Sequence, residues 1–213
     1  MKRALPWRLS SIRVIGLLLS VWAGLVLADS SAVETVQKAT RDILTELQKD
    51  EDELRGNPAA VRALIDRALA PHVDFPRMAR LVLSKHWRVA TTQQKADFTR
   101  EFRGLLVRFY SNALADFLVR KDIPDHIEMT ILATTTDAES NRVAVRTQLE
   151  ASGYPPVQVK YSLYRTDSQW KVYDVSVEGI SLVLNYRTSF ADQIREKGLD
   201  GLIQALARNN AKA

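Results

Sequence analysis

The sequence contains no cysteine and only three histidines among its 213 residues. Without cysteine the chain forms neither disulfides nor thiolate metal sites, so its stability must come from a packed core. His72, His86 and His126 lie far apart and lack the close spacing of a typical metal-binding pair. We therefore expect no metal and no cofactor, and interpret the histidines as surface residues or hydrogen-bonded core residues.

The chain also lacks an excess of one charge once its first residues are set aside. Residues 1–28 hold four of the 30 basic residues and none of the 25 acidic ones, which leaves 26 basic against 25 acidic residues. A nucleic-acid-binding surface needs a cluster of excess basic charge. The composition therefore argues against a nucleic-acid partner.

Residues 1–28 have the pattern of a secretory signal peptide. Four basic residues, of which Arg13 is the last, precede an apolar run over residues 14–28 that ends in small residues. A membrane-spanning helix needs about 20 apolar residues, and this run is shorter. The absence of cysteine also excludes a lipid-modified anchor. We expect cleavage before Asp29 and an exported domain over residues 29–213.

Apolar residues recur every three to four positions over residues 29–120, which predicts a mainly helical region. Thr91, with Gln94 three residues later, has the pattern of a capping box and should start the longest helix. Helices are expected over about residues 31–49, 58–70, 74–83 and 91–119.

The apolar period changes to two over residues 126–177, which predicts a sheet. Strands are expected at 126–135, 141–151, 157–165 and 170–177. Short polar connections suit hairpins, so we predict a four-stranded antiparallel meander. The inward phase slips at Tyr173 and Asp174, which is typical of a bulge. Residues 180–209 read as two C-terminal helices with Gly198 between them. The fold class is therefore α+β, with helices laid over a sheet.

Four segments of the chain resemble the MlaC family, also called the toluene-tolerance auxiliary family. In order, they are residues 73–83, 87–94, 170–187 and 198–203. The resemblance implies a helical group packed on a curved four-stranded sheet, related to the nuclear transport factor 2-like cone. An apolar cavity between the two layers would take phospholipid acyl chains.

The resemblance also implies a function. A member of this family is a periplasmic phospholipid carrier that shuttles lipid between the inner and outer membranes and maintains outer-membrane lipid asymmetry. Phospholipid is then the cargo, and no other cofactor is implied. The implied partners are an inner-membrane ABC transporter complex and an outer-membrane lipoprotein-porin complex, and we expect a monomer.

Strand and helix periods select the residues that we expect to line the cavity. The selected side chains are Leu105, Phe109, Val143, Val145, Val157, Val159, Tyr161, Leu163, Leu182, Tyr186, Arg187 and Phe190. Arg187 lies beside the apolar face of its helix. It would contact a lipid headgroup or form an ordinary salt bridge.

Two other function classes remain open. An exported cone-fold isomerase or hydrolase would place a carboxylate in an apolar pocket, and Asp97 or Asp174 is the candidate. Ser181 lacks the second glycine of a nucleophile elbow, and the role of a helix N-cap or first-turn serine suits it better. The second class is a periplasmic assembly factor whose core is filled by side chains and holds no lipid.

Overall fold

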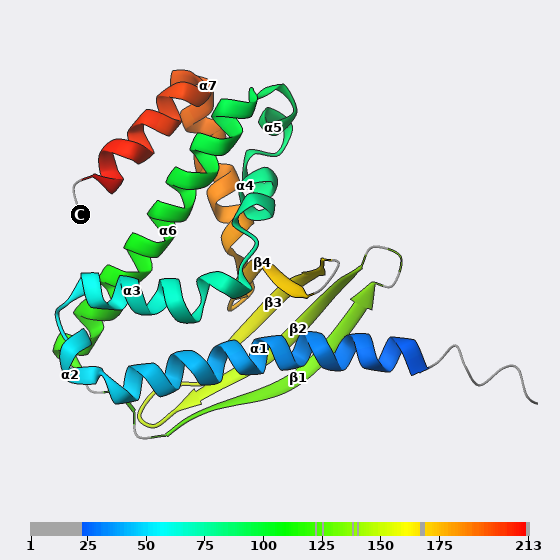
Figure 1. Cartoon of the computed structure of the whole chain (residues 1–213), viewed down its shortest axis with the longest axis vertical. Helices are drawn as coiled ribbons and strands as arrows, with labels where there is room; N and C mark the ends of the chain where they lie inside the picture. Colours follow the sequence, from blue (N-terminus) through cyan, green and yellow to red (C-terminus); the bar gives the residue numbers. More distant parts are fainter. Residues whose placement is uncertain are drawn as a thin grey trace, which may run out of the picture.

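The computed structural model describes residues 23–211, except residues 122, 125, 138, 140, 167 and 168, with side chains from residue 30 onward. Residues 1–22 of the expected signal peptide lie outside this described part. The first helix, α1 (Ala23–Lys49), begins earlier than the expected start near residue 31. Figure 1 shows α1 lying across the sheet, with the other helices gathered beyond the β4 side of that sheet.

The sheet is antiparallel and its strands follow chain order. The strands are β1 (Ile127–Asp137), β2 (Arg142–Ala151), β3 (Val157–Arg165), β4 (Trp170–Val177) and β5 (Ile180–Ser181). The four expected strands are confirmed, but the number four is wrong because β5 adds a fifth. Glu178 and Gly179 both have positive φ, 48° and 80°, as in the tight hairpin turns that match strand twist. After this turn, β5 runs back along β4 and pairs with it at two positions.

The slip in β4 is a bulge, as predicted. The register of β3 and β4 shifts between Ser162 and Leu163, which pair with Asp174 and Val172. Tyr173 is therefore the extra residue, and Val175 returns to the same face as Val172. The bulge keeps the apolar side chains of both halves of β4 on one face.

The remaining helices are α2 (Glu51–Leu54), α3 (Pro58–Ala68), the short 3-10 helix η1 (Ala70–His72), α4 (Phe75–Leu83), α5 (Lys85–Val89), α6 (Thr92–Arg120) and α7 (Leu182–Asn210). Of these, α3, α4 and α6 match the predicted ranges closely, whereas α2, η1 and α5 are short helices that were not predicted. The two predicted C-terminal helices are the two halves of α7, which kinks at Gly198 where φ is 71°. Glycine takes this conformation without the steric cost that a side chain would add.

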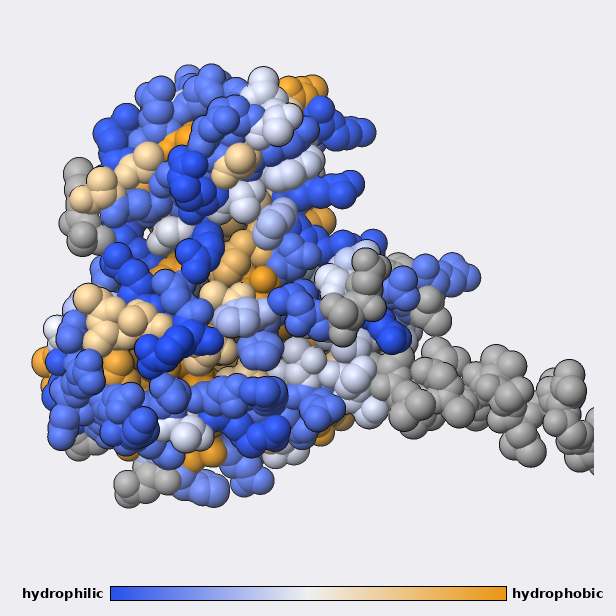
Figure 2. Space-filling view, in the orientation of Figure 1, coloured by the Kyte–Doolittle hydropathy of each residue, from blue (hydrophilic) through white to orange (hydrophobic). Residues whose placement is uncertain are grey.

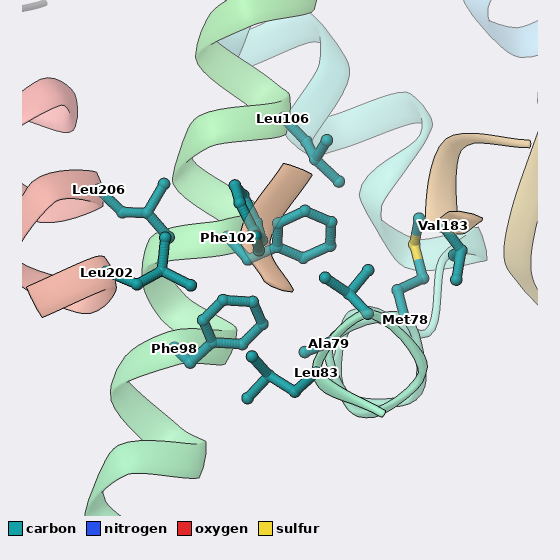
Figure 3. Close-up of a cluster of buried hydrophobic side chains, with 11 residues drawn as sticks. Met78, Ala79, Leu83, Phe98, Phe102, Leu106, Val183, Leu202 and Leu206 are labelled. Carbon is teal, nitrogen blue, oxygen red and sulfur yellow. The ribbon is translucent and has the colours of Figure 1, made fainter. Parts of the chain in front are cut away.

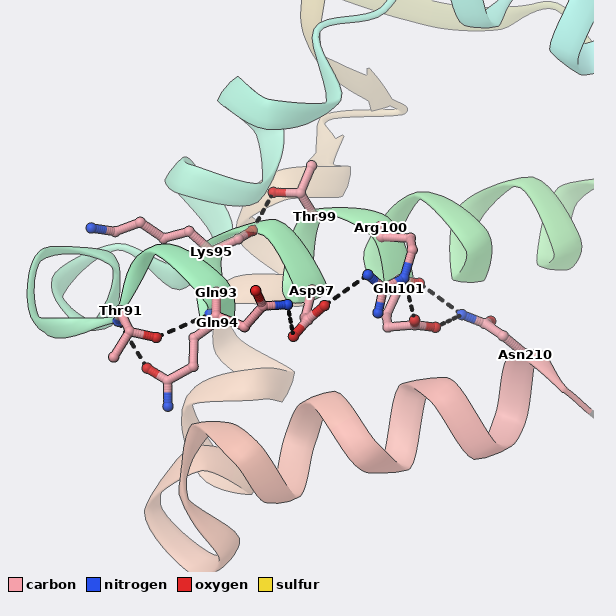
Figure 4. A network of polar contacts seen from close by, with 9 residues as sticks. All are labelled: Thr91, Gln93, Gln94, Lys95, Asp97, Thr99, Arg100, Glu101 and Asn210. Carbon is pink, nitrogen blue, oxygen red and sulfur yellow. Dashed lines mark hydrogen bonds and ion pairs between the residues drawn. The ribbon is translucent and has the colours of Figure 1, made fainter.

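Polar contacts hold the second half of α7 along α6 (Figure 4). The Thr91 hydroxyl accepts from the Gln94 backbone N–H and the Gln94 side chain accepts from the Thr91 N–H, which confirms the capping box. The Gln94 side-chain amide also donates to Asp200 in α7 at 2.8 Å. At the other end, the Asn210 amide donates to the Glu101 backbone oxygen at 2.9 Å. The C-terminal helix is thus fixed at both ends.

Three apolar clusters form the core. One joins α4, α6 and α7 around the stacked rings of Phe98 and Phe102, whose centroids are 5.6 Å apart (Figure 3). A second packs Ala32 and Val36 of α1 onto the sheet. A third joins the end of α1 to α2, α3 and the end of α6. The helical group meets the sheet at β4, where the Asp74 N–H donates to the Val172 oxygen at 2.8 Å.

Candidate functional site: an apolar cleft between β4 and the helices

One face of the sheet carries the apolar side chains of all its long strands. Val145, Tyr161 and Val175 lie opposite one another on β2, β3 and β4, and side chains that pair in register share a face. Helix α1 covers part of this face and forms the second cluster with side chains of β2, β3 and β4, among them Val145, Leu163 and Val172. On β4, Val172 and Val175 also face the helical group, and an open space lies between this part of the strand and the helices.

The inner part of this space is a pocket of about 200 Å³. Its walls are almost wholly apolar. They are formed by Ile65, Leu69, Ala70, Val73, Phe75, Met78, Leu106, Val107, Tyr110, Val172, Val175 and Leu182. These residues belong to α3, η1, α4, α6, β4, the start of α7 and the short segments between the first three helices. The pocket therefore lies where the helical group, the sheet and α7 converge.

A second pocket of about 510 Å³ continues from the first toward solvent. Tyr110, Val175 and Leu182 line both pockets, so we treat the two as one apolar cleft. Its outer wall is formed by Val177, Glu178, Ile180 and Asn185 together with these three. Figure 2 shows apolar residues in the hollow between the helical group and the sheet with α1, on a surface that is otherwise mostly hydrophilic.

The mouth of the cleft exposes large apolar side chains to solvent. Ile180 is 69% exposed and Tyr110 and Val177 are each 46% exposed. Phe109 is also exposed, and its ring meets that of Tyr110 edge to face at 5.3 Å. Burial raises the pKa of the Tyr110 hydroxyl, so this group stays neutral at physiological pH. Glu178 is the charged residue in the wall, and its carboxylate accepts from the Gln158 N–H at 2.5 Å.

The size and lining of the inner pocket suit an apolar ligand. A dry apolar cavity of about 150 Å³ is large enough to bind benzene, and this pocket has a volume of about 200 Å³. Because the pocket opens into the outer part of the cleft, an apolar group that enters it removes apolar wall from contact with water, which is favourable.

The predicted lining residues fall into three places. Leu182 lines both parts of the cleft, and Phe109 lies beside its mouth. The predicted lining residues of β2 and β3 lie on the inward face of the sheet, as expected, but α1 covers most of them. Val143, Val145 and Leu163 are buried in the cluster beneath α1, and Tyr161 packs against it. Val157 is half-buried at the start of β3 and Val159 is buried beside a separate depression.

The predicted residues of α6 and α7 lie mostly in the helical core. Phe190 is buried with Phe98 and Phe102, while Leu105 and Tyr186 pack against this cluster. The Tyr186 ring is half-buried, and burial raises its pKa, with a smaller contribution from Tyr110. These side chains support the cleft from behind.

Arg187 makes a structural contact, and it forms no salt bridge with another residue that the structure describes. Its Nε donates to the backbone oxygen of Leu81 at 2.9 Å. Leu81 lies in the last turn of α4, where backbone oxygens lack helical partners. The bond therefore joins α7 to the end of α4.

The candidate catalytic groups are engaged in helix capping and surface contacts. One oxygen of Asp174 accepts from the Ser181 hydroxyl at 2.7 Å and the other accepts from the Val183 N–H at 3.0 Å. Ser181 is the N-cap of α7, as predicted, because its hydroxyl accepts from the Leu184 N–H. Asp97 is half-buried at the surface of α6, and hydrogen bonds from Gln93 and Arg100 lower its pKa. Among the described residues, no group of three or more acidic or histidine side chains could hold a metal ion.

The sequence prediction missed most of the cleft wall. The strand phase already placed Val172, Val175 and Val177 on the inward face, but β4 was passed over in favour of β2 and β3. The wall formed by α3, η1 and α4 depends on how these helices pack in the tertiary structure. The apolar period predicts which face of each helix is buried, but it does not predict whether that face packs against another element or lines the cleft. Within the described residues, no helix is both long and apolar enough to cross a membrane.

Comparison with known proteins agrees with this geometry. The family model described as "MlaC protein" matches residues 37–208. A toluene tolerance protein, ttg2D, of Pseudomonas putida is 28% identical over 92% of this chain and 89% of its own length. The intermembrane phospholipid transport system binding protein MlaC of Haemophilus influenzae is 20% identical over 86% of this chain and 84% of its own.

A solved structure extends the similarity to the fold. It is that of the phospholipid-binding protein from Ralstonia solanacearum in complex with a phospholipid. The two chains are 31% identical and superpose with a TM-score of 0.74, over 85% of this chain and 98% of the other. The order of helices and strands, the apolar cleft and the match over residues 37–208 lead to one conclusion: this chain belongs to the MlaC family.

Proposed function

We propose that this protein is a periplasmic phospholipid carrier. It holds acyl chains in the cleft between β4 and the helical group and carries lipid between the inner and outer membranes, so that the lipid asymmetry of the outer membrane is maintained. The observation that carries this proposal is the inner pocket, whose walls are almost entirely apolar. The phospholipid bound by the Ralstonia relative supports it.

The physics of lipid transfer explains why such a wall is needed. Burying one methylene contributes about 0.8 kcal/mol, and a bilayer offers the same gain to every methylene that it covers. A carrier must therefore match the bilayer in apolarity. One unpaired polar group facing the acyl chain would favour return to the membrane by a few kcal/mol. The neutral Tyr110 and the position of Glu178 in the outer wall fit this requirement.

The headgroup would stay at the mouth, near Ile180, Asn185 and Glu178. The exposed apolar side chains there would come to be covered when the carrier meets a lipid donor or acceptor. By analogy with the transport system named for the Haemophilus relative, we propose an inner-membrane ABC transporter complex and an outer-membrane lipoprotein-porin complex as those partners. The carrier itself performs no covalent chemistry in this proposal, because Asp174 and Ser181 serve as caps.

Lipid analysis of the exported protein tests the proposal. The full chain is expressed with its first 28 residues, the exported material is purified, and its lipids are extracted and measured by mass spectrometry. We expect about one phospholipid for each protein chain and an N-terminus at Asp29. An isomerase, a hydrolase or an assembly factor with a filled core would carry no stoichiometric phospholipid, and that result would overturn the proposal.

A further inference from the structure

The opposite face of the sheet carries two neighbouring cations. Arg146 on β2 pairs with Lys160 on β3, and Lys160 pairs with Ser176 on β4. The adjacent row, Val145, Tyr161 and Val175, points toward α1 and the cleft, so this row points away from them. Arg146 and Lys160 are exposed, and neither has an ion pair within the described residues. Like charges directly opposite one another on adjacent strands destabilise a sheet.

A small depression lies at this row. Its volume is about 140 Å³, and it is lined by Arg146, Thr147, Gln158, Val159, Lys160, Ser176 and Gly179. Ser176 is only 3% exposed, and its hydroxyl has no hydrogen-bond partner among the described residues. A buried hydroxyl without a partner is uncommon and costs free energy. An unused buried hydroxyl thus lies in one row with two uncompensated cations, with Lys160 on the neighbouring strand and Arg146 one strand further away.

The nearby carboxylates are already engaged. The Glu178 carboxylate accepts from the Gln158 backbone N–H, and the Asp174 carboxylate accepts from Ser181 and Val183. Neither forms an ion pair with Arg146 or Lys160 within the described residues. The positive charge of the row is therefore available to a ligand.

We propose that this depression binds a phosphate-type oxyanion. Arg146 would donate through the planar fork of its guanidinium, Lys160 would supply a point charge, and the Ser176 hydroxyl would donate from below. The side chains of Arg146 and Lys160 are long and flexible, so a change of their rotamers would expose the Ser176 hydroxyl to the ligand. The oxyanion is either free phosphate or the phosphate of an anionic lipid headgroup at a membrane surface.

The site is separate from the lipid cleft but shares a strand with it. Val175 and Val177 line the cleft, while Ser176 between them faces the depression. Lipid content can therefore be measured in the same samples. A failure of the oxyanion site would leave that content unchanged.

Titration of the mature, lipid-loaded protein with inorganic phosphate tests the proposal. Backbone amide shifts are followed by NMR at constant ionic strength, with chloride as the reference anion. We expect saturable shifts at Lys160, Ser176 and Gly179 with phosphate and none with chloride. Phosphate shifts that fail to saturate, or that chloride reproduces, would overturn the proposal.

Two variants and a matched control sharpen the test. Ser176→Ala removes a buried donor that lacks a partner, so its melting temperature in chloride should equal or exceed that of the parent. Its phosphate affinity should fall about tenfold, as for the loss of a charge-assisted hydrogen bond. Lys160→Gln should weaken phosphate binding at least as much. Lys197→Gln makes the same charge change on an exposed position of α7 and should leave binding unchanged. Equal phosphate affinity in all four proteins would refute the site.

Vesicles distinguish the two sources of the oxyanion. Phosphatidylglycerol vesicles are mixed with the parent and with Lys160→Gln, and free phosphate is added as competitor. Vesicle binding that phosphate displaces and that Lys160→Gln loses assigns the site to a lipid headgroup. Phosphate binding without vesicle binding assigns it to a free oxyanion. Both results support the site.

Discussion

Replacing Val175 with tryptophan should empty the carrier without unfolding it. Val175 lies on β4 between the two parts of the cleft and lines both. The indole ring would enter space that is otherwise taken by the acyl chain. Denying the lipid only two methylenes costs about 1.6 kcal/mol, which is more than tenfold in affinity. We therefore expect little phospholipid to be purified with Val175→Trp.

The matched control is Val145→Trp. Val145 faces the same side of the same sheet and lies opposite Tyr161, as Val175 does. However, Val145 is fully buried beneath α1, where there is no cleft. Overpacking a filled core costs typically about 1–3 kcal/mol. At about 2–4 °C for each kcal/mol in a domain of this size, its melting temperature should fall by roughly 2–12 °C.

Phospholipid content and melting temperature are measured together on both variants and on the parent before and after lipid removal. We expect Val175→Trp to melt close to the lipid-free parent and to contain little lipid. Val145→Trp should lose stability and keep its lipid. If Val175→Trp instead kept a full complement of lipid, the acyl chains could not occupy the cleft that we describe. A stability loss in Val175→Trp equal to that of Val145→Trp would show that the space beside β4 is ordinary core.

Three further results are expected. Asp174→Ala removes two hydrogen bonds at the start of α7 and should lower the free energy of unfolding by about 1–2 kcal/mol in denaturant melts. Because Asp174 is a cap in this account, the lipid content should stay as it is, and lost lipid with unchanged stability would contradict that role. The pKa of His72 is lowered by burial and by Lys38, so the unfolded state takes up its proton first as the pH falls. The stability contributed by neutral His72 is therefore complete above about pH 6.5 and decreases as the pH falls below that value. In His72→Gln the melting temperature should decrease less steeply with falling pH in this range, and an unchanged slope would show that His72 does not cause the pH dependence. Finally, lipid capture from vesicles should agree within about threefold between low and high salt, because a nearly neutral mature chain holds its cargo by apolar contact; a steep decrease with salt would indicate that charged groups clamp the headgroup.

The local elements of this fold were predictable from short stretches of sequence. The Thr91–Gln94 capping box and the break at Gly198 each depend on contacts within a few residues, and such contacts leave a pattern in the chain. The bulge at Tyr173 arises from pairing between two adjacent strands, but it also shifts the apolar alternation within β4, which the sequence shows. The two-residue strand β5 was missed because it pairs only Ser176 with Ser181 and Val177 with Ile180. Two residues are too few to show a period.

The resemblance carried by four segments correctly identified the family, and the alternation along β2, β3 and β4 correctly placed their apolar side chains on one face. The sequence by itself could not divide that face between core and cleft. Val145 and Val175 have the same residue type, the same alternation and the same cross-strand neighbour. One lies beneath α1 and the other faces a space. The apolar period predicts which side chains face away from solvent. Whether such a side chain packs in a filled core or lines a cleft depends on the path of α1 across the sheet and on the docking of α3, α4 and α7 beside β4.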